Sequence, residues 1–156
     1  MTELNLNGTR VAVGDDLTRP LLDVLRDEIG DLTPKPGCRE GRCGACTVLV
    51  DGAPVASCLV PLGRVADAQI TTVEGLGNRE QLDPVQQAFE NTGAVQCGIC
   101  TTGMMLTVRA MADEQRTWTR REIQRALANN LCRCTGYTKI LDATEQLLAG
   151  EEPTDG

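Results

Sequence analysis

The sequence predicts an α+β protein in which a small β-rich domain is followed by a small helical domain. Two stretches of the first half alternate apolar and polar side chains around an Asn-Gly or Asp-Gly pair, which is the pattern of a β-hairpin. The second half instead repeats its apolar side chains at the spacing of amphipathic helices. Eight cysteines divide evenly between the halves. We therefore expect two domains, residues 1–76 and residues 77–156, each with four thiols.

The first domain is predicted to contain two hairpins, a helix and a final short strand. The segment ELNLNGTRVAV turns at Asn7-Gly8, and CTVLVDGAPVAS turns at Asp51-Gly52. Between them, RPLLDVLRDEI repeats its leucines at helical spacing, with Pro20 near the start, where its missing N–H is no loss. The segment AQITTVEG is typical of a last strand.

The second domain is predicted to be helical because its segments carry helix start signals. Asp83 is an N-cap followed by Pro84 at the first helical position. Thr119 and Glu122 have the spacing of a capping box. We interpret the methionines of GMMLTVRAM as core residues rather than a cofactor-binding set, because they recur at helical spacing. KILDATEQLL predicts a last helix, and the acidic tail after it predicts a disordered end.

The composition indicates that something besides core packing stabilises the fold. Phe89, Trp118 and Tyr137 are the only aromatic residues, and domains of this size bury little surface. MTELNLNGTRVAV lacks the features of an export signal, and no apolar run is long enough to cross a membrane. We therefore expect a cytoplasmic protein without membrane segments. Its clustered cysteines are expected to hold metal, whereas disulfides are the alternative.

The absence of histidine and the net charge of −7 exclude several classes of function. A chain without histidine forms no Cys/His zinc finger, Rieske centre or histidine-ligated haem, and it offers no imidazole for acid–base catalysis. The acidic balance argues against nucleic acid as a partner, because phosphate binding needs a basic face. Any metal is therefore expected to be bound through sulfur.

The first cysteine set has the spacing of a plant-type ferredoxin. Its pattern is C-x4-C-x2-C with a distant fourth thiol, and glycines between the thiols let the backbone curl around a 2Fe–2S cluster. A zinc site fits less well, because zinc usually takes two short cysteine pairs. Residues 35–42 carry a net charge of +2, which either favours the reduced cluster or is ordinary surface charge. The set consists of Cys38, Cys43, Cys46 and Cys58.

The second cysteine set has a less general pattern. A C-x2-C pair and a C-x-C pair are separated by 31 residues. Both pairs fall in loops or at helix ends, where free N–H groups and helix dipoles favour a negatively charged cluster. A C-x-C pair suits a binuclear core, although the spacing alone leaves zinc as an alternative. The set consists of Cys97, Cys100, Cys132 and Cys134.

Three motifs give the chain a family resemblance. Together, CREGRCGACTVLVDG, QCGICTTGMM and NLCRCTGY resemble the small iron–sulfur subunit of the molybdenum hydroxylases, the family of xanthine dehydrogenase, aldehyde oxidoreductase and aerobic carbon monoxide dehydrogenase. The likeness covers nearly the whole chain, with the motifs in the same order. Thr102 stands where the family commonly has proline, and Asn129 stands where a glycine often precedes NLCRC. Neither departure removes a cysteine.

The resemblance implies a β-grasp, ferredoxin-like 2Fe–2S domain followed by a four-helix bundle with a second 2Fe–2S cluster. It implies that the first cysteine set lies nearer the FAD of a medium partner subunit. The second set would lie next to the molybdopterin-type molybdenum cofactor of a large partner subunit. Gln96 matches the residue that hydrogen-bonds the pterin, and Cys134 matches the cysteine that approaches it most closely. The implied assembly is a heterohexamer, a dimer of heterotrimers.

These inferences lead to a hypothesis about function. A 2Fe–2S cluster carries one electron, so two clusters in series would pass the two electrons of a molybdenum hydroxylation singly to FAD. The chain would then be one subunit of an oxidoreductase, with no substrate turnover of its own. One alternative is a free-standing two-cluster carrier, or part of another oxidoreductase. Another is a zinc-stapled interaction module without a redox role.

Overall fold

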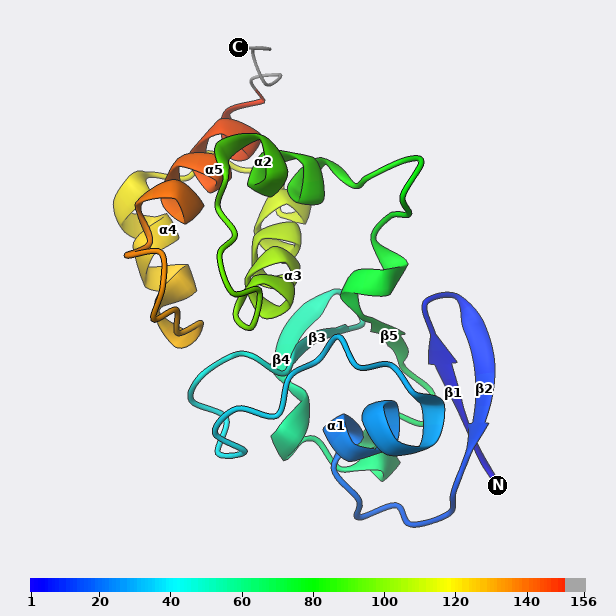
Figure 1. Ribbon diagram of the computed structural model, residues 1–156. Coiled ribbons are helices and arrows are strands. Elements are labelled where there is room, and N and C mark those ends of the chain that lie inside the picture. The colour runs from blue at the N-terminus through cyan, green and yellow to red at the C-terminus, as the bar shows by residue number, and fades with distance from the viewer. Residues whose placement is uncertain (151–156) are drawn as a thin grey trace.

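A five-stranded sheet organises the first part of the chain, in the order β2-β1-β5-β3-β4 (Figure 1). The computed structural model describes residues 1–150. The tail AGEEPTDG was predicted to be disordered, but its first residue, Ala149, ends a helix, and residues 151–156 lie outside the described residues. The two predicted hairpins are present, and each turns through two residues with positive φ. The strands are β1 (Thr2–Leu6), β2 (Thr9–Val13), β3 (Thr47–Val50), β4 (Ala53–Ala56) and β5 (Gln69–Thr71).

Strand β5 joins the two hairpins into one sheet. It runs parallel to β1, where Leu6 pairs with Ile70, and antiparallel to β3, where Val50 pairs with the same residue. Ile70 is buried, which fits a strand in the middle of the sheet. The short 3₁₀ turns around this strand are η2 (Ser57–Leu59), η3 (Leu62–Arg64) and η4 (Val73–Gly75).

One helix packs on the sheet, where the leucine spacing predicted it. It begins as α1 (Leu21–Asp23), continues as the π-helical segment η1 (Val24–Ile29) and ends at Gly30, whose φ is 83°. The wider π turns were not predicted, because apolar spacing over so short a segment does not distinguish them from α turns. The helix, the sheet and the segment 62–68 share one core, whose buried side chains are Leu4, Leu6, Val13, Leu21, Val24, Leu25, Val48, Leu62, Val65, Ala68 and Ile70.

The second part of the chain is helical, as predicted. Phe89 is its largest fully buried side chain, and Met104 and Met111 are buried beside it, which confirms their interpretation as core residues. Met105 is half-buried and packs against the same core. The helices are α2 (Pro84–Thr92), α3 (Thr101–Asp113), α4 (Arg120–Ala126), which continues as the 3₁₀ turn η5 (Leu127–Asn129), and α5 (Thr138–Ala149).

Both predicted N-caps are formed. Asp83 accepts a hydrogen bond from the N–H of Val85 at 2.8 Å, and its own N–H donates to Gln86 Oε1 at 2.9 Å. At α4, the Thr119 N–H donates to Glu122 Oε2 at 2.8 Å, and the Glu122 N–H donates to Thr119 Oγ1 at 3.3 Å. These reciprocal bonds satisfy N–H groups that the first helical turn leaves free.

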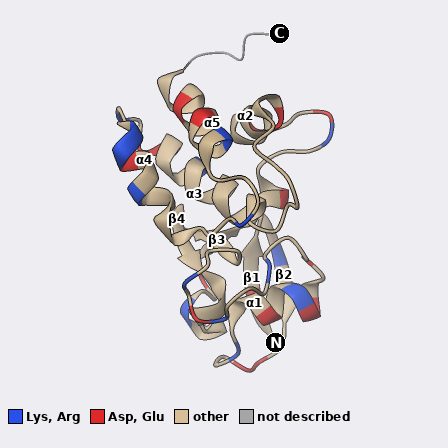
Figure 2. Ribbon diagram, turned by 60° about the vertical axis from the view of Figure 1, so that its left-hand side comes forward, with Lys and Arg blue, Asp and Glu red and all other residues tan. Residues whose placement is uncertain are grey.

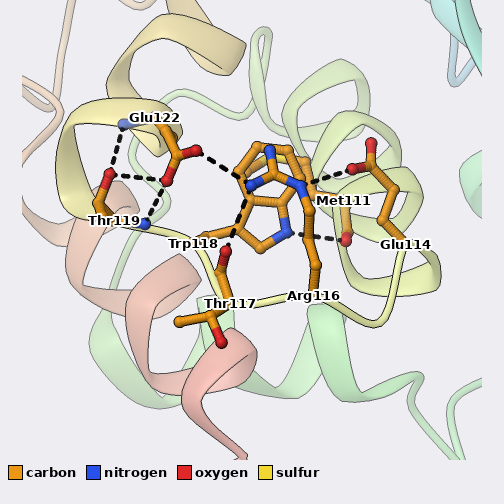
Figure 3. A network of polar contacts seen from close by, with 7 residues as sticks. All are labelled: Met111, Glu114, Arg116, Thr117, Trp118, Thr119 and Glu122. Carbon is orange, nitrogen blue, oxygen red and sulfur yellow. Dashed lines mark hydrogen bonds and ion pairs between the residues drawn. The ribbon is translucent and has the colours of Figure 1, made fainter.

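A network of polar contacts stabilises the loop between α3 and α4 (Figure 3). The Arg116 guanidinium lies 3.3 Å from the centre of the Trp118 ring and pairs with Glu114 at 2.9 Å and Glu122 at 3.1 Å. The Trp118 indole N–H donates to the Met111 carbonyl at 3.2 Å. The network therefore ties the α4 cap to the end of α3 and holds the indole against the helical core.

Lys and Arg positions are interspersed with Asp and Glu positions in both parts of the chain (Figure 2). Arg120 pairs with Asp142 at 3.0 Å and so ties α4 to α5, and Arg109 pairs with the capping Asp83 at 3.3 Å and ties α3 to α2. The Arg120–Asp142 pair is exposed and contributes little to stability, whereas the Asp83 side chain of the second pair is only 12% exposed. Among residues 1–150, no helix is both long and apolar enough to cross a membrane.

Candidate metal centres

The loop that carries the first three cysteines wraps around the sulfur of Cys38. The backbone N–H groups of Glu40, Arg42 and Cys43 point at Cys38 Sγ, at 3.3, 3.3 and 3.4 Å. Positive φ angles at Arg39 and Gly41 turn the loop so that these N–H groups converge. The hydrogen bonds from Glu40, Arg42 and Cys43 lower the pKa of Cys38 to about 6. Its sulfur is therefore prepared as a thiolate, the form that binds metal.

The other three thiols of the first set lie around this loop. Cys43 Sγ accepts a hydrogen bond from the Cys38 N–H at 3.4 Å. Cys46 and Cys58 are buried together, with Cys58 supplied by η2 after the second hairpin. Burial, followed by the neighbouring Cys46 thiol, raises the pKa of Cys58 to about 11. Two close thiols in a buried site resist ionisation, so a cationic metal core would relieve this cost.

Two of the cations predicted near the first set have carboxylate neighbours. Arg39 forms an ion pair with Asp23 of α1 at 2.8 Å, and Arg42 lies 3.8 Å from Glu40. Counting Asp23 lowers the local charge from the expected +2 to +1. The charge count over residues 35–42 did not include Asp23, because this residue lies on another segment of the chain.

The second set forms an outer and an inner pair at the ends of two helices. Cys97 and Cys134 are exposed. The pKa of Cys97 is lowered, first by a hydrogen bond from the Ile99 N–H and then by one with the Cys134 thiol, so the two cysteine side chains face each other. Cys100 is the N-cap of α3 and is buried. Burial, followed by the adjacent Cys132 thiol, raises the pKa of Cys100 to about 12. The C-x2-C and C-x-C segments thus meet sulfur to sulfur.

Three residues for which the sequence predicted no individual role hold the Cys132 loop. The Thr135 hydroxyl lies 3.1 Å from Cys132 Sγ. The Tyr137 hydroxyl accepts from the Cys132 N–H at 2.8 Å and donates to the Asn130 carbonyl at 3.2 Å. NLCRCTGY was predicted to lie in the site, but its sequence did not indicate these contacts. Their polar side chains beside C-x-C were the available signal.

The two cysteine-bearing segments touch directly along a seam. The Leu131 N–H donates to the Cys43 carbonyl at 2.8 Å, and the Asn130 side-chain amide donates to the Gly44 carbonyl at 3.3 Å. A Cβ atom at Gly103 of α3 would lie 2.1 Å from that same Gly44 oxygen. Only glycine therefore fits at position 103, and the two halves meet at backbone contact distance.

The two departures from the family pattern both lie at this seam. The Thr102 hydroxyl donates to the Thr33 carbonyl at 2.9 Å, a bond that a proline could not make. The Asn129 carbonyl oxygen would lie 2.4 Å from a Cβ atom at Gly44. Both residues therefore contribute to the contact between the halves rather than disturbing a cysteine.

The donor set fits binuclear clusters in its chemistry and its arrangement. A 2Fe–2S core takes its four thiolates in two pairs, one pair on each iron. The neighbouring thiols are Cys38 with Cys43, Cys46 with Cys58, Cys97 with Cys134, and Cys100 with Cys132.

Two family models match the chain. Residues 14–89 match the 2Fe-2S iron-sulfur cluster binding domain, and residues 72–145 match the [2Fe-2S] binding domain. The chain is therefore a protein with two 2Fe–2S binding domains.

Relatives and solved structures identify the family. The nicotinate dehydrogenase small FeS subunit of Eubacterium barkeri is 45% identical over 88% of this chain and 87% of its own length. The xanthine dehydrogenase iron-sulfur-binding subunit of Escherichia coli O157:H7 is 44% identical over 90% and 89%. Quinoline 2-oxidoreductase from Pseudomonas putida 86 superimposes with a TM-score of 0.87 at 38% identity, covering 97% of both chains. The aldehyde oxidoreductase from Desulfovibrio gigas has a TM-score of 0.91 at 37% identity, over 98% of this chain and 18% of its own.

This chain belongs to the iron–sulfur subunits of the molybdenum hydroxylase family. It is accordingly a subunit of an oxidoreductase, as its relatives are named dehydrogenase and oxidoreductase subunits.

Proposed function

We propose that the chain holds two 2Fe–2S clusters and relays single electrons from a molybdenum–pterin centre in a large subunit to FAD in a medium subunit. Cys38, Cys43, Cys46 and Cys58 would bind the first cluster, and Cys97, Cys100, Cys132 and Cys134 the second. The observation that carries the proposal is the seam, because it joins a cysteine of one set to the segment of the other through a single backbone hydrogen bond.

The finer architecture belongs to the same proposal. A helix packed on a mixed sheet with β1 and β5 parallel supports a β-grasp, ferredoxin-like domain over residues 1–76. The core shared by α2, α3, α4 and α5 supports a four-helix bundle over residues 77–156. The two family matches overlap between residues 72 and 89, which includes the proposed boundary.

Residues of this chain connect the two proposed cluster sites by a short path. Each 2Fe–2S cluster would supply one-electron chemistry at its site. Leu131, whose N–H bonds the Cys43 carbonyl, directly precedes Cys132, so the two proposed ligand sets are linked by a few covalent bonds and one hydrogen bond. The glycines at positions 44 and 103 keep this separation small.

Exposed apolar side chains near the second set support a partner surface there. Val95, Ile99 and Leu131 are 41, 52 and 57% exposed, and they flank the exposed Cys97–Cys134 pair. Gln96 is exposed beside them, as a pterin contact requires. We place the large subunit on this face, with Gln96 and Cys134 toward the pterin.

The relatives and the cysteine chemistry support the remaining parts of the proposal. The relatives are named as subunits of larger complexes, and the Desulfovibrio gigas match covers only 18% of a longer chain. We propose a heterohexamer with a medium FAD subunit near the first cluster. We also propose a cytoplasmic location, where thiols stay reduced for metal binding.

The assembled complex with Cys134→Ser tests the proposal. Reduced wild-type complex should show two rhombic electron paramagnetic resonance (EPR) signals, of which the variant alters one. Stopped-flow reduction of FAD should also slow in the variant, with nicotinate, xanthine, quinoline and an aldehyde screened as substrates because the relatives' names contain them. Thr138→Ser, an exposed change close to the same loop, is the matched control. Unchanged FAD reduction in Cys134→Ser would contradict the relay.

A further inference from the structure

Cys132 has a sulfur environment unlike that of the other cysteines. Its Sγ lies 3.1 Å from the Thr135 hydroxyl and 3.5 Å from the Thr135 N–H. Within residues 1–150, it is the only cysteine sulfur with a hydrogen bond to a side-chain hydroxyl, whereas Cys38 and Cys43 Sγ accept hydrogen bonds from backbone N–H groups. A side-chain donor is a contact that a point substitution can remove while the backbone stays intact.

The direction of this hydrogen bond follows from its neighbours. The Tyr137 N–H donates to Thr135 Oγ1 at 3.2 Å, so the threonine oxygen already acts as an acceptor. A metal-bound thiolate has no proton to give, which leaves the hydroxyl proton of Thr135 directed at Cys132 Sγ. The hydroxyl therefore stabilises negative charge on this sulfur.

Tyr137 fixes the threonine in this position. Its backbone is left-handed, with a φ of 68°, which is unusual for an aromatic residue. The conformation is held by the two hydrogen bonds of its hydroxyl, to the Cys132 N–H and the Asn130 carbonyl. The Tyr137 N–H thereby faces Thr135 and not the following helix. The strained residue and the hydroxyl donor form one unit around Cys132.

We propose that the Thr135 hydroxyl sets the reduction potential of the second cluster by donating a hydrogen bond to Cys132 Sγ. The inference rests on the proposed function, because it requires a 2Fe–2S cluster at the second cysteine set. Reduction adds one electron, supplied by the molybdenum centre of the partner, and therefore one negative charge spread over the core and its thiolates. No bond to hydrogen forms or breaks, since the proton stays on Thr135. A donor to a ligand sulfur stabilises the more negative state and raises the potential.

Thr135→Val in the assembled complex tests this directly, because valine keeps the shape and removes the hydroxyl. At a fixed potential, EPR-monitored redox titration should find the reduced-to-oxidised ratio of the second cluster lowered about tenfold, equivalent to a shift of about −59 mV for one electron. The first cluster, which receives no bond from Thr135, is the internal control and should keep its potential. Thr135→Ser retains a hydroxyl and should restore the wild-type value.

Each outcome decides the inference. A second-cluster potential unchanged in Thr135→Val, or equal shifts of both clusters, would overturn it. If the valine variant does not assemble, Thr135→Ala removes the same hydroxyl with less bulk and must show the same shift. A wild-type potential of the second cluster in Thr135→Ser would support the proposal. A potential in Thr135→Ser as low as that in Thr135→Val would contradict it. If the reduced wild-type complex shows no iron–sulfur signal, the proposed function itself fails.

Discussion

Gly103→Ala gives the sharpest test of the seam between the two halves. A Cβ atom at this position would lie 2.1 Å from the Gly44 carbonyl oxygen, whereas ordinary contacts begin near 3.4 Å. The α3 backbone and the Cys43–Cys46 loop would therefore have to separate by about 1 Å. The Leu131–Cys43 hydrogen bond, 2.8 Å long, would be stretched by the same movement.

The expected magnitude comes from two opposing effects. Overpacking of a close contact costs about 1–3 kcal/mol, and the better helix propensity of alanine returns about 1 kcal/mol. We expect a net loss of about 1–2 kcal/mol, which lowers the melting temperature of a chain of this size by about 3–8 °C. The assay is thermal denaturation of the cluster-loaded protein, followed by circular dichroism and by visible absorbance.

A control separates the clash from the general effect of losing a glycine. Gly8 has a φ of 78° in the first hairpin turn, and nothing lies within 4 Å of an added Cβ. Gly8→Ala should cost about 1 kcal/mol through its backbone alone and leave the EPR signals unchanged. Gly103→Ala melting at or above the wild-type temperature would refute the reasoning, since propensity would then outweigh the contact.

Further predictions concern the helical half and the metal. Phe89→Ala should destabilise the folded state by about 3–5 kcal/mol, because the ring is fully buried. Denaturant unfolding measures this loss, and a clearly smaller value would contradict the assignment of Phe89 to the core. Thr119→Ala should cost about 1 kcal/mol by removing the α4 cap, measured against the exposed Thr138→Ala. Hydrogen bonds from the Thr119 backbone and side chain and then from Arg116 lower the pKa of Glu122 from 4.5 to about 2, so its contribution to stability is complete above pH 4.5 and is lost as the pH falls toward 2. The melting-temperature difference between wild type and Glu122→Gln should be constant above pH 4.5 and narrow below it. Removal of the clusters by a chelator and reductant should unfold both halves, and a cooperative melt of the metal-free chain would contradict this.

Much of the fold could be predicted because its signals are local. The Asn7-Gly8 and Asp51-Gly52 turns, the Asp83 cap and the Thr119–Glu122 capping box all lie within a few residues of the elements that they define. The parallel pairing of β1 with β5 was not predicted, because it joins segments more than 60 residues apart and leaves no mark on local periodicity.

The candidate site was predictable to a similar degree. Cysteine spacing and neighbouring motifs indicated both sets, and the structure brings the thiols of each set together in pairs. The pairing of Arg39 with Asp23 and the bond from Leu131 to Cys43 depend on tertiary contacts. The contact between the Thr135 hydroxyl and Cys132 Sγ also depends on the folded loop, since a threonine three residues after a cysteine reaches its sulfur only in particular loop conformations.

Quantitation of iron, acid-labile sulfide and zinc in the purified native protein tests the central claim most directly. Two binuclear clusters predict about four irons and four sulfides per chain, together with two distinguishable EPR signals after reduction. Stoichiometric zinc with neither iron nor sulfide would contradict the claim that the eight cysteines hold two 2Fe–2S clusters.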